Sequence, residues 1–196
     1  MAYAFYTTKA FVLSRREVSE ANFLYDFFTE QFGRISARAQ GVRKLASKLR
    51  YNLQPFARVE VTLVRGREGW RIVGAWPDSH FASIKENSAK RHTFSEVLAM
   101  IDRLYTGERP EARLFEEVSA AAAFLDQNHL GSESLEAYRL LLVFRLVDQL
   151  GYAARPLPLE PFLEENAWTR DVVESFLPHR RIAAGIIEQA LQASHL

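Results

Sequence analysis

Residues 34–40 read RISARAQ, and apolar and polar side chains alternate along this stretch. The apolar positions are Ile35, Ala37 and Ala39, and the polar ones are Arg34, Ser36, Arg38 and Gln40. An alternation of period two places the two kinds of side chain on opposite faces of an extended chain. The stretch is therefore predicted to be a half-buried β-strand.

The segments after this strand predict a β-hairpin. From about Phe56 to Val64, one face carries Ala57, Val59, Val61 and Leu63. Gly66 and Gly69 then bracket a turn. Residues 70–76 follow as the second strand, with Trp70, Ile72 and Trp76 at alternate positions.

Two further strands are predicted upstream, at residues 9–15 and 22–29, and a polar turn at residues 16–21 separates them. Five strands with one interruption, at residues 42–52 between the third and the fourth, match the order of an OB-fold barrel. A helix over residues 22–32 remains an alternative, because Phe23, Phe27 and Phe28 also suit one helical face.

From His80 onward the apolar period is that of helices. One stripe runs from Phe94 to Tyr105, introduced by a capping box of Thr93 and Glu96, and the next runs from Leu114 to Leu125. A third helix, from about Ser132 to a stop at Gly151, is apolar almost all round and should be the buried centre. An extended loop at residues 156–161 and helices at 167–177 and 180–193 follow. We therefore expect an α+β chain of two domains, an OB-fold barrel at 1–80 and an all-α domain at 81–196.

Composition narrows the class of protein. Of the 196 residues, 48% are hydrophobic and 25% charged, which is typical of a globular chain. The sequence contains no cysteine, so disulfides, thiolate catalysis and Cys-based zinc sites are excluded. No apolar run approaches the length of a membrane helix, and the start MAYAFYTTKAF lacks the order of a signal peptide. We expect a cytoplasmic protein.

The net charge of +1 conceals an asymmetry between the two halves. Residues 1–80 hold 13 Lys and Arg against 7 Asp and Glu, a net of +6, and the remainder has a net of −5. This distribution indicates a module that binds a polyanion, joined to a domain that need not touch it.

The segment RISARAQGVRKLASKLR, residues 34–50, contains six cations and no acid. Arg34 and Arg38 lie four apart on one strand face, and cations spaced along a surface suit a phosphate backbone. Nearby Phe32, Tyr51 and Trp70 could offer faces for base stacking, although Phe32 and Trp70 suit the core better. The alternative for the whole segment is a solvated basic face. The candidate polyanion-binding residues are Arg15 and Arg16, in the predicted loop, and Arg34, Arg38, Arg43, Lys44, Lys48 and Arg50.

Enzyme motifs are missing from the sequence. It contains no Walker loop and no GxGxxG, HExxH or GxSxG arrangement. The adjacent acids Glu116–Glu117 and Glu164–Glu165 are expected at the surface, and the five histidines lack metal-ligand spacing. We expect no catalytic residue, no metal site and no cofactor.

With the basic segment on the third strand of a barrel, the sequence resembles the RecO family. The matching pieces are AFVLSRREVSEA at 10–21, FTEQFGRISARAQGVRKLASKLR at 28–50 and LQPF at 53–56. The helical half resembles the family through YRLLLVFRLVDQLGY at 138–152. Many members carry a four-cysteine zinc module after this point; here the segment AARPLPLEPFL has no cysteine. The chain is also short for the family.

The resemblance implies a nucleoid-associated recombination mediator without a cofactor. Such a protein binds single- and double-stranded DNA, anneals complementary strands and, with RecR and single-stranded-DNA-binding protein, helps to load RecA on coated single strands. The competing hypotheses are an OB-fold accessory factor for RNA and an enzyme using Glu160, Glu164 and Glu165.

The resemblance further implies that the helical domain docks the acidic, aromatic-ended tail of single-stranded-DNA-binding protein. The candidate cations for its carboxylates are Arg139, Arg145, Arg180 and Arg181. For Arg139 and Arg145, the plainer interpretation is an internal ion pair, for instance with Asp148 or Glu136 at helical spacing. Arg180 and Arg181 open a helix, where cations oppose the helix dipole and an external anion is favoured slightly.

Overall fold

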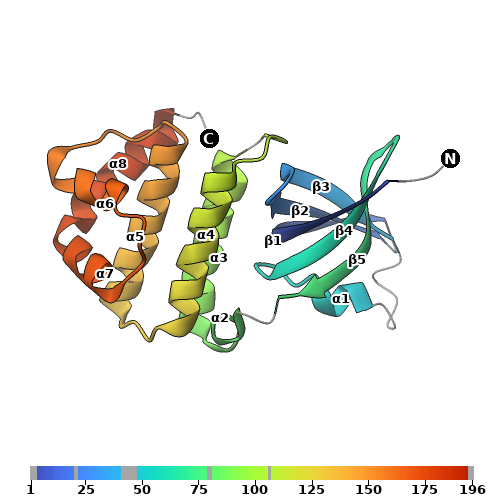
Figure 1. Ribbon diagram of the computed structural model, residues 1–196, viewed down its shortest axis with the longest axis horizontal. Helices are drawn as coiled ribbons and strands as arrows, with labels where there is room; N and C mark the ends of the chain where they lie inside the picture. Colours follow the sequence, from blue (N-terminus) through green and yellow to red (C-terminus); the bar gives the residue numbers. More distant parts are fainter. Residues whose placement is uncertain (1–3, 20–21, 41–47, 79–80, 106, 194–196) are drawn as a thin grey trace. The chain divides into compact units, whose positions relative to one another are not determined.

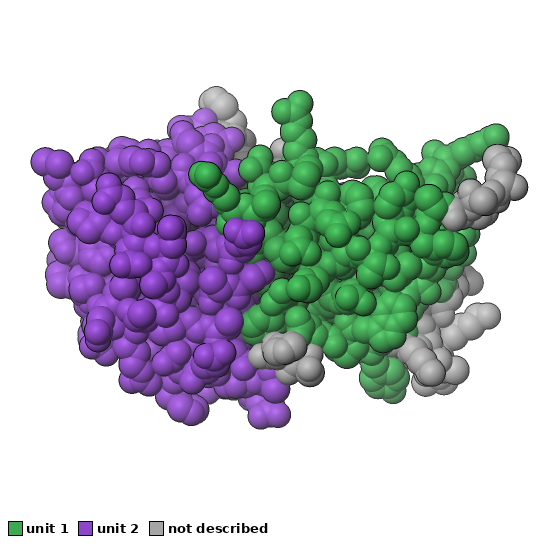
Figure 2. Space-filling model, viewed as in Figure 1, with its two compact units in different colours: residues 1–81, 101–115 green, residues 82–100, 116–196 purple. Residues whose placement is uncertain are grey.

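The computed structural model describes residues 4–19, 22–40, 48–78, 81–105 and 107–193. It contains two compact units, coloured separately in Figure 2. Unit 1 comprises residues 1–81 and 101–115, and unit 2 comprises residues 82–100 and 116–196. The division into a barrel domain at 1–80 and a helical domain at 81–196 stays a prediction.

Five strands form the closed barrel of unit 1 (Figure 1), namely β1 (Phe5–Ser19), β2 (Asn22–Thr29), β3 (Gly33–Ala39), β4 (Arg58–Gly66) and β5 (Gly69–Pro77). Their order around the barrel is β1-β2-β3-β5-β4, with β4 pairing back to β1. The β3–β5 pair is parallel and the other pairs are antiparallel. The short helix α1 (Lys48–Asn52) lies between β3 and β4 in the chain. The predicted fold class, a barrel followed by helices, is confirmed.

The barrel core comes from the alternation on which the prediction rested. Ile35, Ala37 and Ala39 of β3 are buried, and so are Val59, Val61 and Leu63 of β4. These side chains form one apolar cluster with Tyr25 and Phe27 of β2, among others. Residues 22–29 are a strand, so the helical alternative for this segment is wrong.

Irregularities in the strand pairing change which side chains face outward. Val73 is an extra residue in β5, because Leu63 pairs with Ile72 and Thr62 with Gly74. Beyond this bulge, Ala75 takes the buried position. Trp76 is therefore 54% exposed, whereas the predicted alternation placed it on the same face as Trp70. The pairing of β1 with β2 shifts register at Leu13 and again at Val18, and β1 runs to Ser19 through the predicted turn.

Segment 101–115 packs against the outside of β1 and β2 within unit 1. The ring of Phe28 lies 5.6 Å from that of Tyr105 and 5.4 Å from that of Phe115. Phe11 also contacts Phe115, at 5.5 Å between ring centroids. This part of the outer barrel surface is therefore apolar and covered.

The helices are α2 (Ala82–Glu86), α3 (Ser88–Leu104), α4 (Ala112–Gln127), α5 (Ser132–Gln149), α6 (Glu160–Glu164), α7 (Arg170–Phe176) and α8 (Arg180–Ala193), with 3₁₀ turns η2 (Leu157–Leu159) and η3 (Leu177–His179). As predicted, α5 is the buried centre of unit 2, and it packs against α6, α7 and α8. It ends before Gly151, whose φ of 79° suits the residue after a helix.

Two helix predictions are wrong. The predicted capping box fails because α3 begins at Ser88, where the Asn87 side chain accepts hydrogen bonds from the backbone N–H groups of Ala89 and Lys90. Residues 157–164 are not an extended loop, because Pro158 and Pro161 occupy first-turn positions that need no N–H donor.

Candidate nucleic-acid interface

Arg34 is held by acids of its own unit. Its Nε donates to Oδ1 of Asp102 over 2.9 Å, and its Nη2 lies 2.8 Å from the same oxygen and 4.0 Å from Oδ2 of Asp26. The side chain is a quarter exposed. Its charge is therefore largely neutralised, and Arg34 is a weaker candidate for binding phosphate than its place in the sequence indicates.

Asp26 is a buried carboxylate on the outer surface of the barrel, between Ser14 and Ser36. Ser14 Oγ donates to Asp26 over 2.9 Å, and Ser36 Oγ donates to its other oxygen. These bonds compensate the burial of a charge. The face that carries Arg34 therefore contains an acid and is not a uniform row of cations.

Exposed cations line up across the strands. In the register, Arg16 of β1 pairs with Leu24 of β2, Leu24 with Arg38 of β3, and Arg38 with Arg71 of β5. Neighbouring strands lie about 4.8 Å apart, so Arg38 and Arg71 are next to each other and Arg16 is two strands further. We call Arg16, Arg38 and Arg71 the arginine row.

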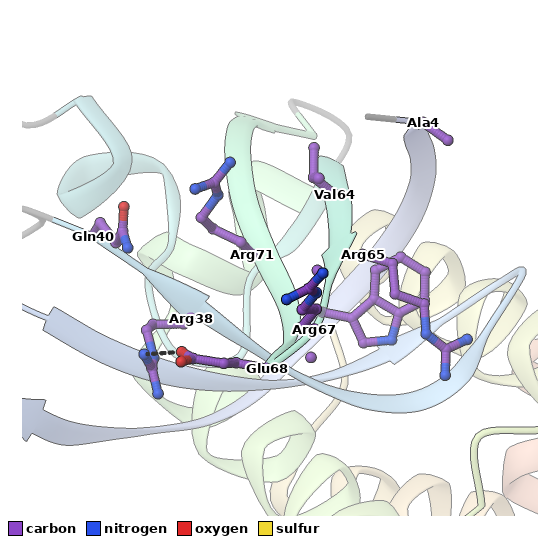
Figure 3. Close-up of a pocket in the computed structure, with 11 residues that line it drawn as sticks. Ala4, Arg38, Gln40, Val64, Arg65, Arg67, Glu68 and Arg71 are labelled. Carbon is purple, nitrogen blue, oxygen red and sulfur yellow. Dashed lines mark hydrogen bonds and ion pairs between the residues drawn. The ribbon is translucent and has the colours of Figure 1, made fainter. Parts of the chain in front are cut away.

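Two members of the arginine row, Arg38 and Arg71, line a pocket of about 770 Å³ in unit 1 (Figure 3). Its wall contains Ala4, which precedes β1, and Arg38 and Gln40 at the end of β3. Residues 64–71 of the β4–β5 hairpin complete it. Four arginines line it, Arg38, Arg65, Arg67 and Arg71, against one acid, Glu68. We call it the arginine pocket.

Sequence analysis missed three of these arginines. They belong to the segment RGREGWR, residues 65–71, where two glycines make the turn and Gly69 adopts a φ of 104°. The tight turn keeps Arg65 and Arg71 on paired strands instead of separating them along the chain. The high density of arginine beside a glycine turn is the sequence signal that could have identified these three residues.

The ion pairs around the pocket are exposed. Glu68 accepts from Nη1 of Arg38 over 3.3 Å, and Arg65 Nη2 lies 3.6 Å from Glu108. Exposed pairs of this kind contribute about 0–1 kcal/mol, so both arginines can exchange their partner for a phosphate at little cost. Arg67 is exposed and has no acidic partner in the described part of the chain.

The remaining cations predicted to bind the polyanion lie in β1, in α1 and outside the described residues. Arg15 and Arg16 lie in β1, not in a loop, and the Arg15 guanidinium is 5.5 Å from the centre of the Phe23 ring. Burial raises the pKa of neighbouring Tyr25, and the charge of Arg15 partly offsets this. Lys48 and Arg50 lie in α1, and Arg43 and Lys44 fall outside the described residues.

Aromatic side chains at the pocket divide into core and surface. Trp70 is 7% exposed and packs against Phe32, with ring centroids 5.1 Å apart. Trp70 therefore belongs to the core, as predicted, and Phe32 is partly buried against that core. Tyr51 of α1 is 75% exposed.

In unit 2, Arg145 is buried and fully engaged. Its Nη1 donates to Glu117 over 3.0 Å, its Nε donates to the carbonyl of Phe162 over 2.9 Å, and its Nη2 donates to the carbonyl of Glu165. The internal partner is Glu117 of α4, not Asp148 or Glu136. Glu117, expected at the surface, is buried with it.

The remaining cations of unit 2 are more accessible. Arg139 Nε lies 3.4 Å from Glu96, and Arg180 Nε lies 3.9 Å from Glu136. Arg181 is exposed at the start of α8. The structure therefore leaves Arg139, Arg180 and Arg181 within reach of an external anion and encloses Arg145.

The described residues contain neither a metal-binding cluster nor a membrane-spanning helix. No group of three His, Asp or Glu side chains in this part of the chain could hold a metal ion. None of its helices has the length and apolar character needed to cross a bilayer.

Comparison with known proteins finds similarity to one family of DNA repair proteins. Residues 1–73 match the family model of the Recombination protein O N terminal region. A protein of Heliobacterium modesticaldum named DNA repair protein RecO is 31% identical over 148 residues, 75% of this chain and 52% of that relative. A protein of the same name from Nocardioides sp. is 31% identical over 151 residues, 76% of this chain and 60% of that relative.

A third protein of that name, from Glaesserella parasuis, is 56% identical over 48 residues, 24% of this chain and 20% of that relative. The chain spans about half the length of the curated relatives that it matches over most of its own length.

Proposed function

Because this chain belongs to the RecO family, we propose that it binds DNA through its barrel and acts in DNA repair and recombination. The bound forms would be single- and double-stranded DNA, and the protein would anneal complementary strands. One observation carries the proposal, namely the four arginines that line one pocket of the barrel with a single acid. Cations grouped in this way attract phosphates and release their condensed counterions.

The proposed footprint differs from the one expected from sequence. We place the arginine row and the arginine pocket at its centre, with Arg15, Arg43, Lys44, Lys48 and Arg50 as further contributors. Arg34 would act mainly by holding segment 101–115 through Asp102. Its replacement would therefore affect folding as well as binding.

Membership of the family also supports the proposal that this protein works with other repair proteins. We propose that the protein cooperates with RecR and single-stranded-DNA-binding protein and helps to load RecA on coated strands, in the nucleoid-associated fraction of the cytoplasm. Neither a catalytic step nor a cofactor is part of this proposal.

The test is a strand-annealing assay with complementary oligonucleotides, either bare or coated with single-stranded-DNA-binding protein. We expect faster annealing with the unmodified protein than without it, and little acceleration with an Arg38→Glu/Arg71→Glu variant. RNA oligonucleotides of the same sequence form the second arm. A clear preference for RNA would replace the proposal with an RNA-binding role, and no acceleration of any substrate would refute annealing.

Tail docking in unit 2 needs a separate measurement. We propose Arg139, Arg180 and Arg181 as the cations that meet the tail carboxylates, because Arg145 is enclosed. A labelled acidic tail peptide is titrated against Arg139→Ala and against the Arg180→Ala/Arg181→Ala variant. Equal affinity for all proteins would exclude these cations, and no binding by the unmodified protein would exclude tail docking.

A further inference from the structure

Arg65 lies over an aromatic ring at the wall of the arginine pocket. Its guanidinium carbon is 5.2 Å from the centre of the Trp70 ring, and both residues line the pocket. At this distance the guanidinium is attracted electrostatically to the face of an indole. The contact holds a flexible side chain against a fixed surface.

The indole beneath Arg65 is held in place by two other rings. Tyr6 contacts Trp70 at 5.4 Å with an interplanar angle of 86°, and Phe32 contacts it at 5.1 Å with an angle of 45°. Tyr6 and Phe32 also contact each other, at 5.6 Å. Trp70 therefore cannot turn outward without disrupting the end of the barrel core, and it forms a rigid support.

The other side of Arg65 is accessible, because its side chain is 62% exposed. Its acidic neighbour Glu108 is itself mostly exposed, and such a pair restrains the arginine weakly. A guanidinium is planar and stacks on aromatic faces, and nucleic-acid bases are bound on arginine planes in this way. The position thus combines a supported plane with an open face.

We propose that Arg65, supported by Trp70, is a stacking platform for an unpaired base of a single strand. The inference rests on the proposed binding of DNA and narrows its substrate at this site. Bases within a duplex already stack on their neighbours, so they present no free face, whereas bases of a single strand can unstack onto a side chain. Phosphates of the same strand would meet Arg38, Arg67 and Arg71 around the pocket.

Arg67 provides a matched control. It lies on the same hairpin, lines the same pocket and is exposed, but no ring contact of Arg67 occurs in the described part of the chain. Replacing either arginine with lysine keeps the charge and removes the plane. A loss specific to position 65 therefore reports stacking and not phosphate attraction.

The experiment compares a labelled single-stranded oligonucleotide with an abasic strand of the same length by fluorescence anisotropy. For the unmodified protein we expect tighter binding to the strand with bases. Stacking of one base contributes about 1–3 kcal/mol, which corresponds to roughly 5- to 150-fold in affinity. Arg65→Lys should lower this ratio at least fivefold, without changing affinity for the abasic strand. Arg67→Lys should leave the ratio unchanged.

Failure of the platform and failure of DNA binding give different results. An unchanged ratio in Arg65→Lys, with both strands still bound, overturns the platform alone. No binding of either strand by the unmodified protein overturns the platform and the proposed function together. A duplex of equal length should bind Arg65→Lys and the unmodified protein equally, and a loss as large as that for the single strand would overturn the platform, because a duplex offers no free base face at this site.

Discussion

Arg145 carries a full positive charge into the interior of unit 2, where it is 4% exposed beside a Glu117 side chain that is 8% exposed. Two backbone carbonyls, the Glu117 carboxylate and the face of the Trp168 ring at 4.7 Å surround the guanidinium. Trp168 also donates from Nε1 to Glu117 over 2.9 Å. The pair thus ties together α4, α5 and the segment before α7.

Arg145→Ala should lower the free energy of unfolding by about 3–5 kcal/mol, because Glu117 would remain buried without its cation. Arg139→Ala is the control, since it breaks the more exposed pair with Glu96 and should cost less than about 1 kcal/mol. Urea-induced unfolding measures both. Similar small losses in the two variants would contradict the structural role assigned to Arg145.

Tyr138 has a buried hydroxyl that finds no hydrogen-bond partner among the described residues. Burial, and then the nearby Glu117 charge, raises the pKa of its phenol well above 10. The unfolded chain ionises Tyr138 near pH 10, whereas the folded chain keeps it neutral. Stability from this residue is therefore complete below pH 10 and is lost as the pH rises above 10.

Tyr138→Phe should reduce the alkaline loss of stability. At about pH 7 the free energy of unfolding should stay the same or rise by up to about 1 kcal/mol, because an unpaired buried hydroxyl is removed. At about pH 11 the variant should be more stable than the unmodified protein by a larger margin than at pH 7. Part of the alkaline loss should remain, because burial also raises the pKa values of Tyr25 and Tyr105. Urea unfolding at both pH values, with exposed Tyr152→Phe as control, tests this, and equal margins would contradict it.

Among elements, β3 depends on a close backbone contact at its first residue. Gly33 has a φ of 66°, and a Cβ added there would overlap the carbonyl oxygens of Gly107 and Arg109. The next residue, Arg34, donates its backbone N–H to the Gly107 carbonyl over 3.0 Å. Glycine therefore allows segment 101–115 to approach the start of β3.

Gly33→Ala should cost about 2–6 kcal/mol, the sum of backbone strain at positive φ and of overpacking against carbonyl oxygens. Gly69→Ala provides the comparison, because Gly69 also has a positive φ but a Cβ there would meet no atom within 4 Å. It should cost only the strain, about 1–3 kcal/mol. Thermal unfolding followed by circular dichroism measures both losses. A Gly69 variant as unstable as the Gly33 variant would show that the contact with segment 101–115 is unimportant.

Elements with a regular period could be predicted from sequence, because burial repeats at a fixed interval. The β3 and β4 faces and the buried helix α5 are of this kind. The bulge at Val73 could not be predicted, since it depends on how β5 pairs with β4. Trp76 was consequently placed on the wrong face.

The site was predicted less completely than the fold, because its parts meet through tertiary structure. The neutralisation of Arg34 requires Asp102, which is remote in sequence and belongs to a helix. The pocket requires a hairpin to bring residues 65–71 beside Arg38. The periodicity of a single segment predicts neither the ion pair of Arg34 nor the assembly of the pocket.

At the scale of the whole molecule, charge is divided between the two halves of the chain, with a net of +6 on residues 1–80 and −5 on the remainder. The structure further concentrates positive charge at one side of the barrel, where Arg38 and Arg71 of the arginine row line the arginine pocket. Salt screens charges within about 10 Å at 0.1 M, so binding should depend on these local cations and much less on the small net charge.

Salt dependence of binding to single-stranded DNA provides the final prediction. If Arg38, Arg67 and Arg71 each neutralise one phosphate while Arg65 stacks on a base, the slope of log affinity against log salt should be near −2, from about −0.7 per contact. An Arg38→Glu/Arg71→Glu variant should weaken binding strongly and bring the slope to about −0.7, because two of the three contacts are lost. Arg109→Glu/Arg113→Glu changes the net charge equally at residues outside the pocket lining, and should reduce affinity far less with the slope nearly unchanged.

The measurement is fluorescence anisotropy of a labelled oligonucleotide over about 50–300 mM salt, with circular dichroism spectra confirming that each variant is folded. Because both variants carry the same change in charge, long-range repulsion affects them alike and cancels in the comparison. Equal losses would therefore place the footprint outside the arginine pocket. A slope near zero for the unmodified protein would mean that phosphates contribute little, and the barrel would then have to bind DNA through its bases.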